Sequence, residues 1–281
     1  MTHLISIDDF RAIQNDDDIL IFDATFVLPS MNRNAPVEFT QIHIPKAQFF
    51  DIDKVADQSS DLPHMIPARE AFQDMMRALG VCNHHKIIIY DNSPFLSAAR
   101  AWWLFRLFGK QNVFVLDGGL PAYVSSGGEI THGEAKARPL GDFNCATPLA
   151  TVMLFDTLLA HMTNKDDIQI VDARPQGRFD GSVAEPRAGL RSGHMPGALN
   201  VPVTELIDKT SGKMRDLDSL KAVFEEAGFD FSKPAITSCG SGVTAAGLTL
   251  ALAELGKYDI ALYDGSWSEW GASDAPISCS V

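Results

Sequence analysis

The chain has 281 residues and carries 36 acidic against 23 basic side chains, which gives a formal net charge of −13. Hydrophobic residues make up 46% and charged residues 21%, a balance that is typical of a folded protein and excludes a disordered one. The length is comfortable for two domains, and because both halves are acidic, we expect no binding to nucleic acid or to a membrane surface.

Short apolar runs alternate with longer amphipathic ones along the chain. The runs at 86–90 and 113–116 have the length and composition of buried strands, and residues 97–109 between them have helical spacing with a glycine at the end. The second half repeats this order at 234–238, 244–256 and 259–263. Strand, helix and strand at such spacing predict a parallel sheet with crossover helices.

Four segments of the first half return in the second half in the same order. The matching pairs are 21–24 with 170–173, 42–52 with 193–203, 87–93 with 235–241, and 113–123 with 260–270. Their nearly constant separation of 147–151 residues indicates a duplicated domain. The stretch 125–148 is polar, rich in glycine and without a period, as linkers are. We therefore expect domains over 1–130 and 151–281, joined by a linker over 131–150.

The chain has four cysteines, Cys82, Cys145, Cys239 and Cys279, and none belongs to a C-x-x-C pair, which argues against a zinc or thioredoxin-type site. We see no secretory signal and no apolar run long enough to span a membrane. Scattered thiols without an export signal favour the reducing cytoplasm. We interpret all of the cysteines except Cys239 as small buried hydrophobic side chains.

Cys239 follows a predicted strand and begins the loop Cys239-Gly240-Ser241-Gly242-Val243-Thr244, which leads into a helix. Sites in open α/β sheets form beyond the carboxyl ends of the strands. The two glycines permit a tight loop with inward N–H groups, and such a loop at a helix amino terminus binds anions and stabilises a thiolate. Cys239 is therefore predicted to be a nucleophile. The first half has Asp91 at the matching position, so we expect that half to be catalytically silent.

The duplicated layout, with Asp91 opposite Cys239, resembles the two-domain rhodanese superfamily, and the loop CGSGVT is similar to that of the 3-mercaptopyruvate sulfurtransferases. Further similar segments are FFDID at 49–53, HMIP at 64–67, ARAWWLFRLFG at 99–109, GRF at 177–179, EPR at 185–187, SGHMPGALNVP at 192–202 and LYDGSWSEWG at 262–271. The resemblance implies an α/β fold with two tandem rhodanese-like domains, each a mainly parallel sheet flanked by helices.

Three chemistries use a cysteine in such a loop, and charge separates them. In the thiosulfate branch of the family, cationic side chains usually follow the cysteine and end the loop, where this chain has Gly240 and Thr244. A related cysteine phosphatase needs an arginine six residues after the cysteine, where this chain has Ala245. A neutral loop suits a monoanionic donor such as 3-mercaptopyruvate, whose carboxylate is bound elsewhere.

Four arginines, Arg174, Arg178, Arg187 and Arg191, fall within 18 residues. The resemblance implies that Arg178 and Arg187 bind the substrate, because they match the family's substrate-binding arginines. A guanidinium group suits a carboxylate and an adjacent keto oxygen. We interpret Arg174 as a structural partner and Arg191 as a solvated charge.

The resemblance also implies a catalytic relay of Asp53, His64 and Ser241. Because the first two belong to the other domain, such a relay would place the site at the domain interface. The alternative for His64 is a structural role at an interface turn. His43 and His194 occupy equivalent turns in both halves, and we interpret them as structural.

These features give the hypothesis of sulfur transfer from 3-mercaptopyruvate through a Cys239 persulfide to cyanide, a small thiol or thioredoxin, with release of pyruvate. Backbone N–H groups of the loop, which also contains Gly240, Gly242, Val243 and Thr244, would stabilise the sulfur. We expect no metal and no organic cofactor. Two alternatives stay open: a thiosulfate:cyanide sulfurtransferase, and a non-catalytic rhodanese-type module that carries sulfur or binds a protein.

Overall fold

The computed structural model describes residues 2–280 and contains two five-stranded sheets. Neighbouring strands are parallel in both sheets. The first sheet has the strand order β1-β5-β4-β2-β3 and the second has the order β6-β10-β9-β7-β8. The two orders correspond strand by strand, which confirms the predicted duplication and the predicted parallel sheets. The expected outer limits at residues 1 and 281 lie outside the described residues.

The strands of the first sheet are β1 (Leu4–Ile5), β2 (Ile19–Asp23), β3 (Gln48–Phe49), β4 (Lys86–Tyr90) and β5 (Val113–Leu116). Those of the second are β6 (Thr151–Met153), β7 (Gln169–Asp172), β8 (Leu199–Asn200), β9 (Ala235–Ser238) and β10 (Ile260–Tyr263). The first lobe has helices α1 (Ile7–Ile13), α2 (Ala35–Gln41), α3 (Arg69–Ala78), α4 (Ala98–Leu107) and α5 (Gly119–Ser125), and the 3-10 turn η1 (Pro29–Met31). The second has α6 (Phe155–Asn164), α7 (Gln176–Asp180), α8 (Leu217–Glu226), α9 (Ala245–Glu254), α10 (Ser266–Trp270) and η2 (Val203–Leu206).

The sequence-based prediction of the elements holds closely in the segments that it named. The strands at 86–90 and 113–116 agree residue for residue, and each of the two predicted helices begins one residue later and ends two residues earlier. Residues 126–150 contain no helix or strand and run back over the first lobe, where Thr131 and His43 form an isolated bridge. No helix among residues 2–280 combines the length and the apolar character needed to cross a bilayer.

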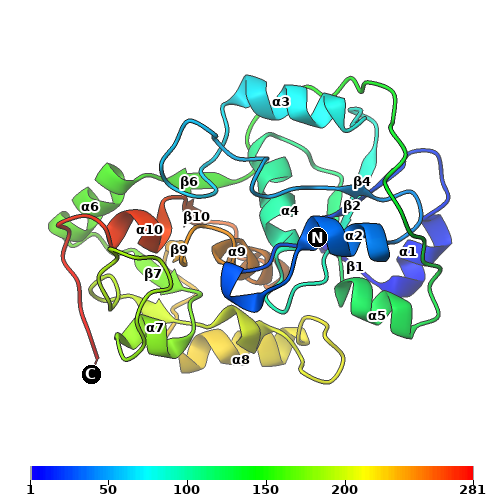
Figure 1. Ribbon diagram of the computed structural model, residues 1–281. Helices are drawn as coiled ribbons and strands as arrows, with labels where there is room; N and C mark the ends of the chain where they lie inside the picture. Colours follow the sequence, from blue (N-terminus) through cyan, green and yellow to red (C-terminus); the bar gives the residue numbers. More distant parts are fainter. Residues whose placement is uncertain (1, 281) are drawn as a thin grey trace.

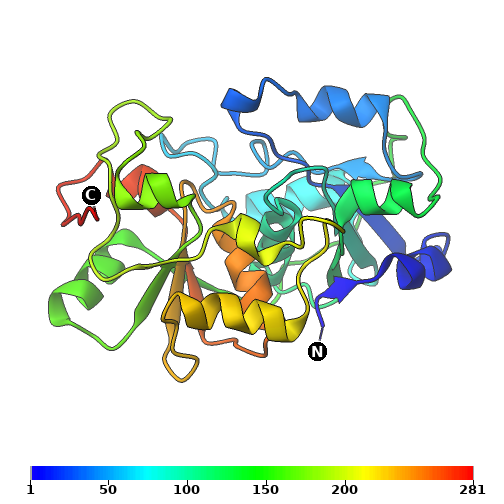
Figure 2. The ribbon, with the colours of Figure 1, turned by 90° about the horizontal axis from the view of Figure 1, so that it is seen from below.

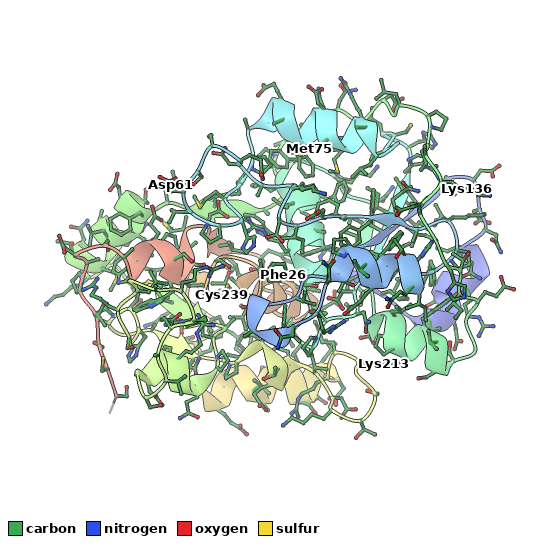
Figure 3. All side chains as sticks on the ribbon, viewed as in Figure 1. Phe26, Asp61, Met75, Lys136, Lys213 and Cys239 are labelled. Atoms are coloured by element: carbon green, nitrogen blue, oxygen red, sulfur yellow. The ribbon has the colours of Figure 1, made fainter. Side chains whose placement is uncertain are left out.

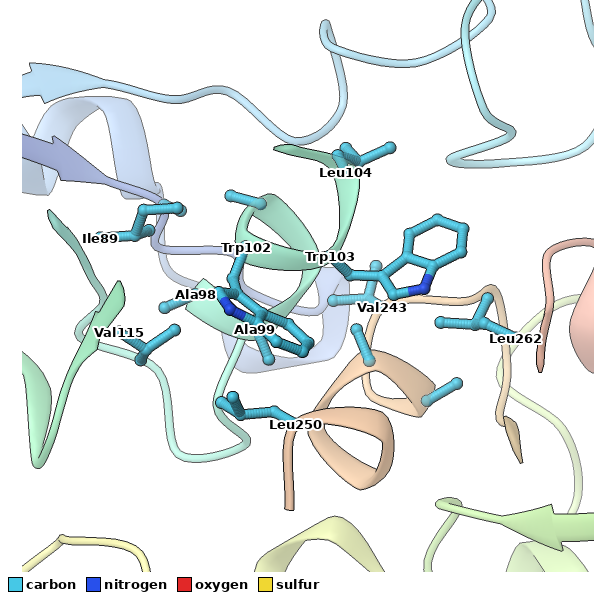
Figure 4. Close-up of a cluster of buried hydrophobic side chains, with 14 of the residues drawn as sticks. Ile89, Ala98, Ala99, Trp102, Trp103, Leu104, Val115, Val243, Leu250 and Leu262 are labelled. Carbon is cyan, nitrogen blue, oxygen red and sulfur yellow. The ribbon is translucent and has the colours of Figure 1, made fainter. Parts of the chain in front are cut away.

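Helices α4 and α9 hold the two lobes together (Figures 1 and 2). All residues of α4 except Arg106 and all residues of α9 except Glu254 are buried, so both helices lie in the core of the molecule. Figure 4 shows Trp102 and Trp103 of α4 beside Val243 and Leu250 of the second lobe. These side chains belong to one apolar cluster that continues through both lobes. The first lobe is therefore packed directly against the segment that follows Cys239.

Candidate functional site

Cys239 lies where β9 ends and the loop to α9 begins, and its side chain is buried. Its backbone N–H donates to the Ser266 hydroxyl at 3.2 Å, and its carbonyl accepts from the Trp267 N–H at 2.9 Å. The Gly240 carbonyl accepts from the N–H of Ser268 at 2.9 Å and from its hydroxyl at 2.6 Å. Helix α10 therefore fixes the backbone of Cys239 and Gly240, with two serine hydroxyls and two backbone N–H groups.

The backbone donors of the loop remain available for a ligand. Within residues 2–280, the N–H groups of residues 240–243 have no protein acceptor. A carboxylate or sulfur anion beside Cys239 could take these hydrogen bonds. The inward cradle that the sequence predicts requires these groups to be free, and that requirement is met.

Cys239 lines a cavity of about 270 Å³ between the two lobes. One part of the wall consists of loop residues and of Arg174, Arg178 and Arg187. The first lobe supplies an apolar part of the wall, which consists of Phe26, Leu28 and Phe95. Figure 3 shows Phe26 and Cys239 next to each other at the junction of the lobes. The cavity thus combines a thiol, guanidinium groups and an apolar surface.

A buried carboxylate orients Arg178. Glu185 accepts from Arg178 at 2.5 Å and from Arg174 at 2.8 Å, and Arg174 also pairs with Asp172 at 2.7 Å. A Cβ atom on Gly240 would lie 3.1 Å from Nη2 of Arg178, so the glycine makes room for the guanidinium above the loop. Arg174 is thus paired as the sequence predicts, and Arg178 lies over Gly240, the residue after Cys239.

Arg187 lies on the same side of the cavity and donates to the Ser268 hydroxyl at 3.3 Å. Partial burial is the main cause that lowers the pKa of Arg187, and the positive charge of Arg178 adds to it. The neighbouring Cys239 and Glu185 act in the opposite direction. Two guanidinium groups that repel each other beside a thiol form a local positive site, although the chain as a whole is acidic.

The three predicted relay residues meet across the lobe boundary. Nδ1 of His64 lies 2.9 Å from the Ser241 hydroxyl, and Nε2 of His64 lies 2.9 Å from Oδ1 of Asp53. His64 is buried, whereas the Asp53 side chain is 69% exposed. The hydrogen bond from His64 lowers the pKa of Asp53, which keeps that carboxylate ionised. Ser241 lines the cavity, and the His64 ring lies behind it.

Other histidines make the same contacts in both halves. Nδ1 of His43 bonds to the Phe39 carbonyl at 2.8 Å, and Nδ1 of His194 bonds to the Phe179 carbonyl at 2.7 Å. Each ring also stacks on that phenylalanine, at centroid distances of 4.0 and 3.9 Å. Because the contact recurs in the half that lacks the cysteine, it fits the structural interpretation.

The interpretation of three cysteines from the sequence is wrong. Cys82 and Cys145 are only half-buried and Cys279 is exposed, because none of them lies in a strand or helix of the core. Arg191 is exposed, in agreement with its interpretation as a solvated charge, and its guanidinium also donates to the carbonyls of Trp270, Gly271 and Ala275.

The sequence analysis also missed residues that build the loop. Ser266 and Ser268 support Cys239 and Gly240, and Glu185 holds Arg178. A signal for the two serines was present, because the matching positions of the first half carry Gly119 and Pro121. Hydroxyls that appear only in the half with the cysteine indicate a role near that cysteine.

Asp91 fills the matching loop of the first lobe with its own side chain. Its carboxylate accepts from the Ala98 N–H at 2.7 Å and from the Ser97 hydroxyl at 3.1 Å. Its carbonyl accepts from the Leu120 N–H at 2.8 Å, just as the Cys239 carbonyl accepts from Trp267. Burial raises the pKa of Asp91 to about 6, with hydrogen bonds from Ala98 and Ser97 opposing the shift.

The raised pKa makes Asp91 a source of pH-dependent instability. The folded state binds this proton more tightly than the unfolded chain, so stability should fall as the pH rises from about 4 to about 6. At about 1.4 kcal/mol per pKa unit, the ionised group costs roughly 3 kcal/mol at neutral pH. We expect Asp91→Asn to raise the melting temperature at pH 7.5 and to lose this advantage toward pH 4. Thermal melts across that range test it, and an equal difference at both ends would contradict it.

The comparisons with known proteins agree with this architecture. The model of the rhodanese-like domain matches residues 6–126 and 155–273. The 3-mercaptopyruvate sulfurtransferase of Escherichia coli K12 is 46% identical over 266 residues, which cover 94% of this chain and 93% of that protein. The mitochondrial thiosulfate/3-mercaptopyruvate sulfurtransferase 1 of Arabidopsis thaliana is 38% identical over 294 residues, with 98% and 77% covered.

The solved structures include a similar protein with the same layout. The crystal structure of SseA from Escherichia coli, a 3-mercaptopyruvate sulfotransferase in its description, has a TM-score of 0.85 and 41% identity. The match covers 95% of this chain and 99% of that one. Among residues 2–280, no group of three or more histidine, cysteine, aspartate or glutamate side chains is placed to hold a metal ion. The chain belongs to the rhodanese family, as a two-domain member of its 3-mercaptopyruvate sulfurtransferase branch.

Proposed function

We propose that this chain transfers sulfur from 3-mercaptopyruvate to an acceptor through a persulfide on Cys239 and releases pyruvate. The observation that carries the proposal is the cavity in which Cys239 lies beside Arg178 and Arg187. A monoanionic donor with a carboxylate and a keto oxygen presents acceptors for both guanidinium groups. Its sulfur then lies near the thiol.

In the proposed first step, the Cys239 thiolate attacks the thiol sulfur of the donor. The new S–S bond forms as the donor's C–S bond breaks, and the electron pair leaves with the carbon as the enolate of pyruvate. One proton converts the enolate to pyruvate, and the transferred sulfur stays on Cys239 as a persulfide. Arg178 and Arg187 stabilise the charge that develops on the departing oxygen atoms.

The proposal assigns Ser241, His64 and Asp53 to the movement of protons at the donor thiol. The contacts of 2.9 Å on both sides of the His64 ring support this assignment. Asp53 holds the ring in position, and the ring orients the Ser241 hydroxyl that lines the cavity. The N–H groups of Gly240, Ser241, Gly242 and Val243 and the helix that begins after Thr244 stabilise the sulfur anion.

In the proposed second step, an acceptor removes the outer sulfur. Cyanide, a small thiol and thioredoxin are the candidate acceptors, and the covalent intermediate predicts ping-pong kinetics. The first domain stays silent, because Asp91 replaces the nucleophile and fills its own loop. The four unpaired cysteines support a reducing compartment, and we propose the cytoplasm.

A comparison of sulfur donors tests the substrate. We expect 3-mercaptopyruvate to add 32 Da to the peptide that contains Cys239, with a kcat/KM at least about tenfold above that of thiosulfate. The reason is that Gly240 and Thr244 place no cationic side chain for a dianion, and a lost charge-assisted contact costs about tenfold or more. Peptide mass spectrometry and pyruvate release provide the measurements.

Two outcomes would support the alternatives instead. Equal or better loading from thiosulfate would favour a thiosulfate:cyanide sulfurtransferase. No loading from either donor would favour a non-catalytic sulfur-carrying or protein-binding module.

A further inference from the structure

A buried ion pair crosses the lobe boundary behind the cavity. Arg100 of α4 and Asp264, which follows β10, are each about 1% exposed, and Nη2 of Arg100 lies 2.9 Å from Oδ1 of Asp264. Neither side chain lines the cavity. The face of the guanidinium also lies over the Trp103 ring, 4.8 Å from its centroid. Burial of two charges carries a desolvation penalty, which additional hydrogen bonds of the pair offset.

The pair forms hydrogen bonds with the backbone at and beside His64 of the proposed relay. Nη2 of Arg100 also donates to the His64 carbonyl, and Oδ2 of Asp264 accepts from the Ile66 N–H at 2.7 Å. One ion pair therefore fixes the chain at His64 and again two residues later. His64 has a φ of +61°, a left-handed conformation that is uncommon for a residue other than glycine. The two contacts hold the chain in that conformation, and with it the direction of the His64 ring.

The same arginine reaches the loop that carries the nucleophile. Nη1 of Arg100 lies 3.4 Å from the Gly242 carbonyl, and Gly242 follows the Ser241 hydroxyl that His64 contacts. Gly242 has a φ of +79°, and a Cβ atom there would lie 3.0 Å from Nη1 of Arg100. One guanidinium thus contacts the backbone of His64 and that of the residue that follows Ser241.

Comparison of the two halves shows that the aspartate of this ion pair has a counterpart in the other half, whereas the arginine has none. The sequence repeat pairs Asp264 with Asp117, and Asp117 likewise accepts a backbone N–H from the other lobe, that of Met214 at 2.8 Å. The aspartate contact therefore belongs to the packing of the lobes in both halves. Arg100 has no such counterpart, because the matching turn of α9 carries Gly247 and Leu248. An arginine at this helix position therefore occurs in α4, which contacts the loop after Cys239, and not in α9.

We propose that Arg100, held by Asp264, is a positioning residue that sets the spacing between His64 and Ser241. This inference rests on the relay assigned under the proposed function. A misplacement of about 1 Å at a reacting group can lower a rate by about a hundredfold. The fork of Arg100 reaches Asp264, His64 and Gly242 together, whereas the single ammonium of a lysine does not.

A double-mutant cycle on the full chain tests the proposal. In Arg100→Lys, we expect kcat for pyruvate release to fall about tenfold to a hundredfold, with KM for 3-mercaptopyruvate changed less than about twofold, because Arg178 and Arg187 are untouched. In a His64→Ala background, the same substitution should lower kcat by about twofold or less. Arg106→Lys is the matched control, since Arg106 lies on the same helix and donates to the Leu149 carbonyl away from the site.

The outcomes separate the proposal from the relay itself. If His64→Ala lowers kcat and Arg100→Lys lowers it by the same factor with or without His64, the positioning role is wrong and the relay stands. A normal kcat in Arg100→Lys also overturns the positioning role. If His64→Ala keeps the wild-type kcat, the relay assignment fails, and the positioning role fails with it. Should Arg100→Lys not fold, Asp264→Asn takes its place in the same cycle.

Discussion

Replacement of Cys239 by serine is expected to abolish the release of pyruvate from 3-mercaptopyruvate, by a factor of at least about 10⁴. A hydroxyl is a poor nucleophile toward sulfur and does not form the persulfide that the transfer requires. The loop should keep its shape, because Ser266, Trp267 and Ser268 hold it through backbone atoms of residues 239 and 240. Coupled detection of pyruvate and the intact mass after incubation with the donor measure both effects.

Cys279→Ser is the matched control, since this thiol is exposed and does not line the cavity. It should load 32 Da and release pyruvate like the unaltered chain. A Cys239→Ser protein that still makes pyruvate would overturn the mechanism. So would a chain in which the extra sulfur is found on a cysteine other than Cys239.

The sequence alone is enough to single out Cys239 as the proposed nucleophile, because that inference depends on neighbouring residues in the chain. The run from β9 through Cys239 to α9 has strand and helix signals on either side of a glycine loop. In a parallel sheet, such a loop lies at the edge where sites form. The duplication strengthened this prediction, since Asp91 marks the same point in the half without a nucleophile.

The relay and its support depend on contacts between residues far apart in the chain. Ser241 and His64 are 177 positions apart, and Arg100 and Asp264 are 164 apart. No periodicity or spacing connects such residues, so only the family resemblance grouped Asp53, His64 and Ser241. The pairing of Arg100 with Asp264 was not predicted at all, because it joins α4 of the first lobe to the end of β10 in the second.

Burial was the second property that the sequence did not convey. We expected buried thiols at Cys82, Cys145 and Cys279, but the buried thiol is Cys239. The expectation treated cysteine as a small apolar residue wherever it occurs. In the structure, burial depends on the element in which a cysteine lies. Cys239 follows the buried central strand β9, which is covered on both faces, whereas the other three cysteines lie outside the helices and strands.

Removal of the Arg187 guanidinium is expected to lower kcat/KM for 3-mercaptopyruvate by about a hundredfold or more, because a charge-assisted contact with the donor is lost. Arg187→Gln is the cleaner choice of the two arginines. Arg178 is also tied to buried Glu185, whereas Arg187 makes one long contact of 3.3 Å to Ser268. The fold should therefore tolerate the change, and the lower kcat/KM should reflect the lost contact with the substrate.

A donor without the carboxylate shows whether Arg187 acts as proposed. Mercaptoacetone keeps the thiol and the keto group of 3-mercaptopyruvate and lacks its negative charge. The unaltered chain should prefer 3-mercaptopyruvate strongly, and Arg187→Gln should reduce that preference by about the same factor by which it lowers kcat/KM for 3-mercaptopyruvate. Arg187→Lys should restore part of it, because the charge returns without the planar fork. If Arg187→Gln instead slows both donors equally, its role lies in the loop through Ser268 and Gly240, and the carboxylate is bound by another group.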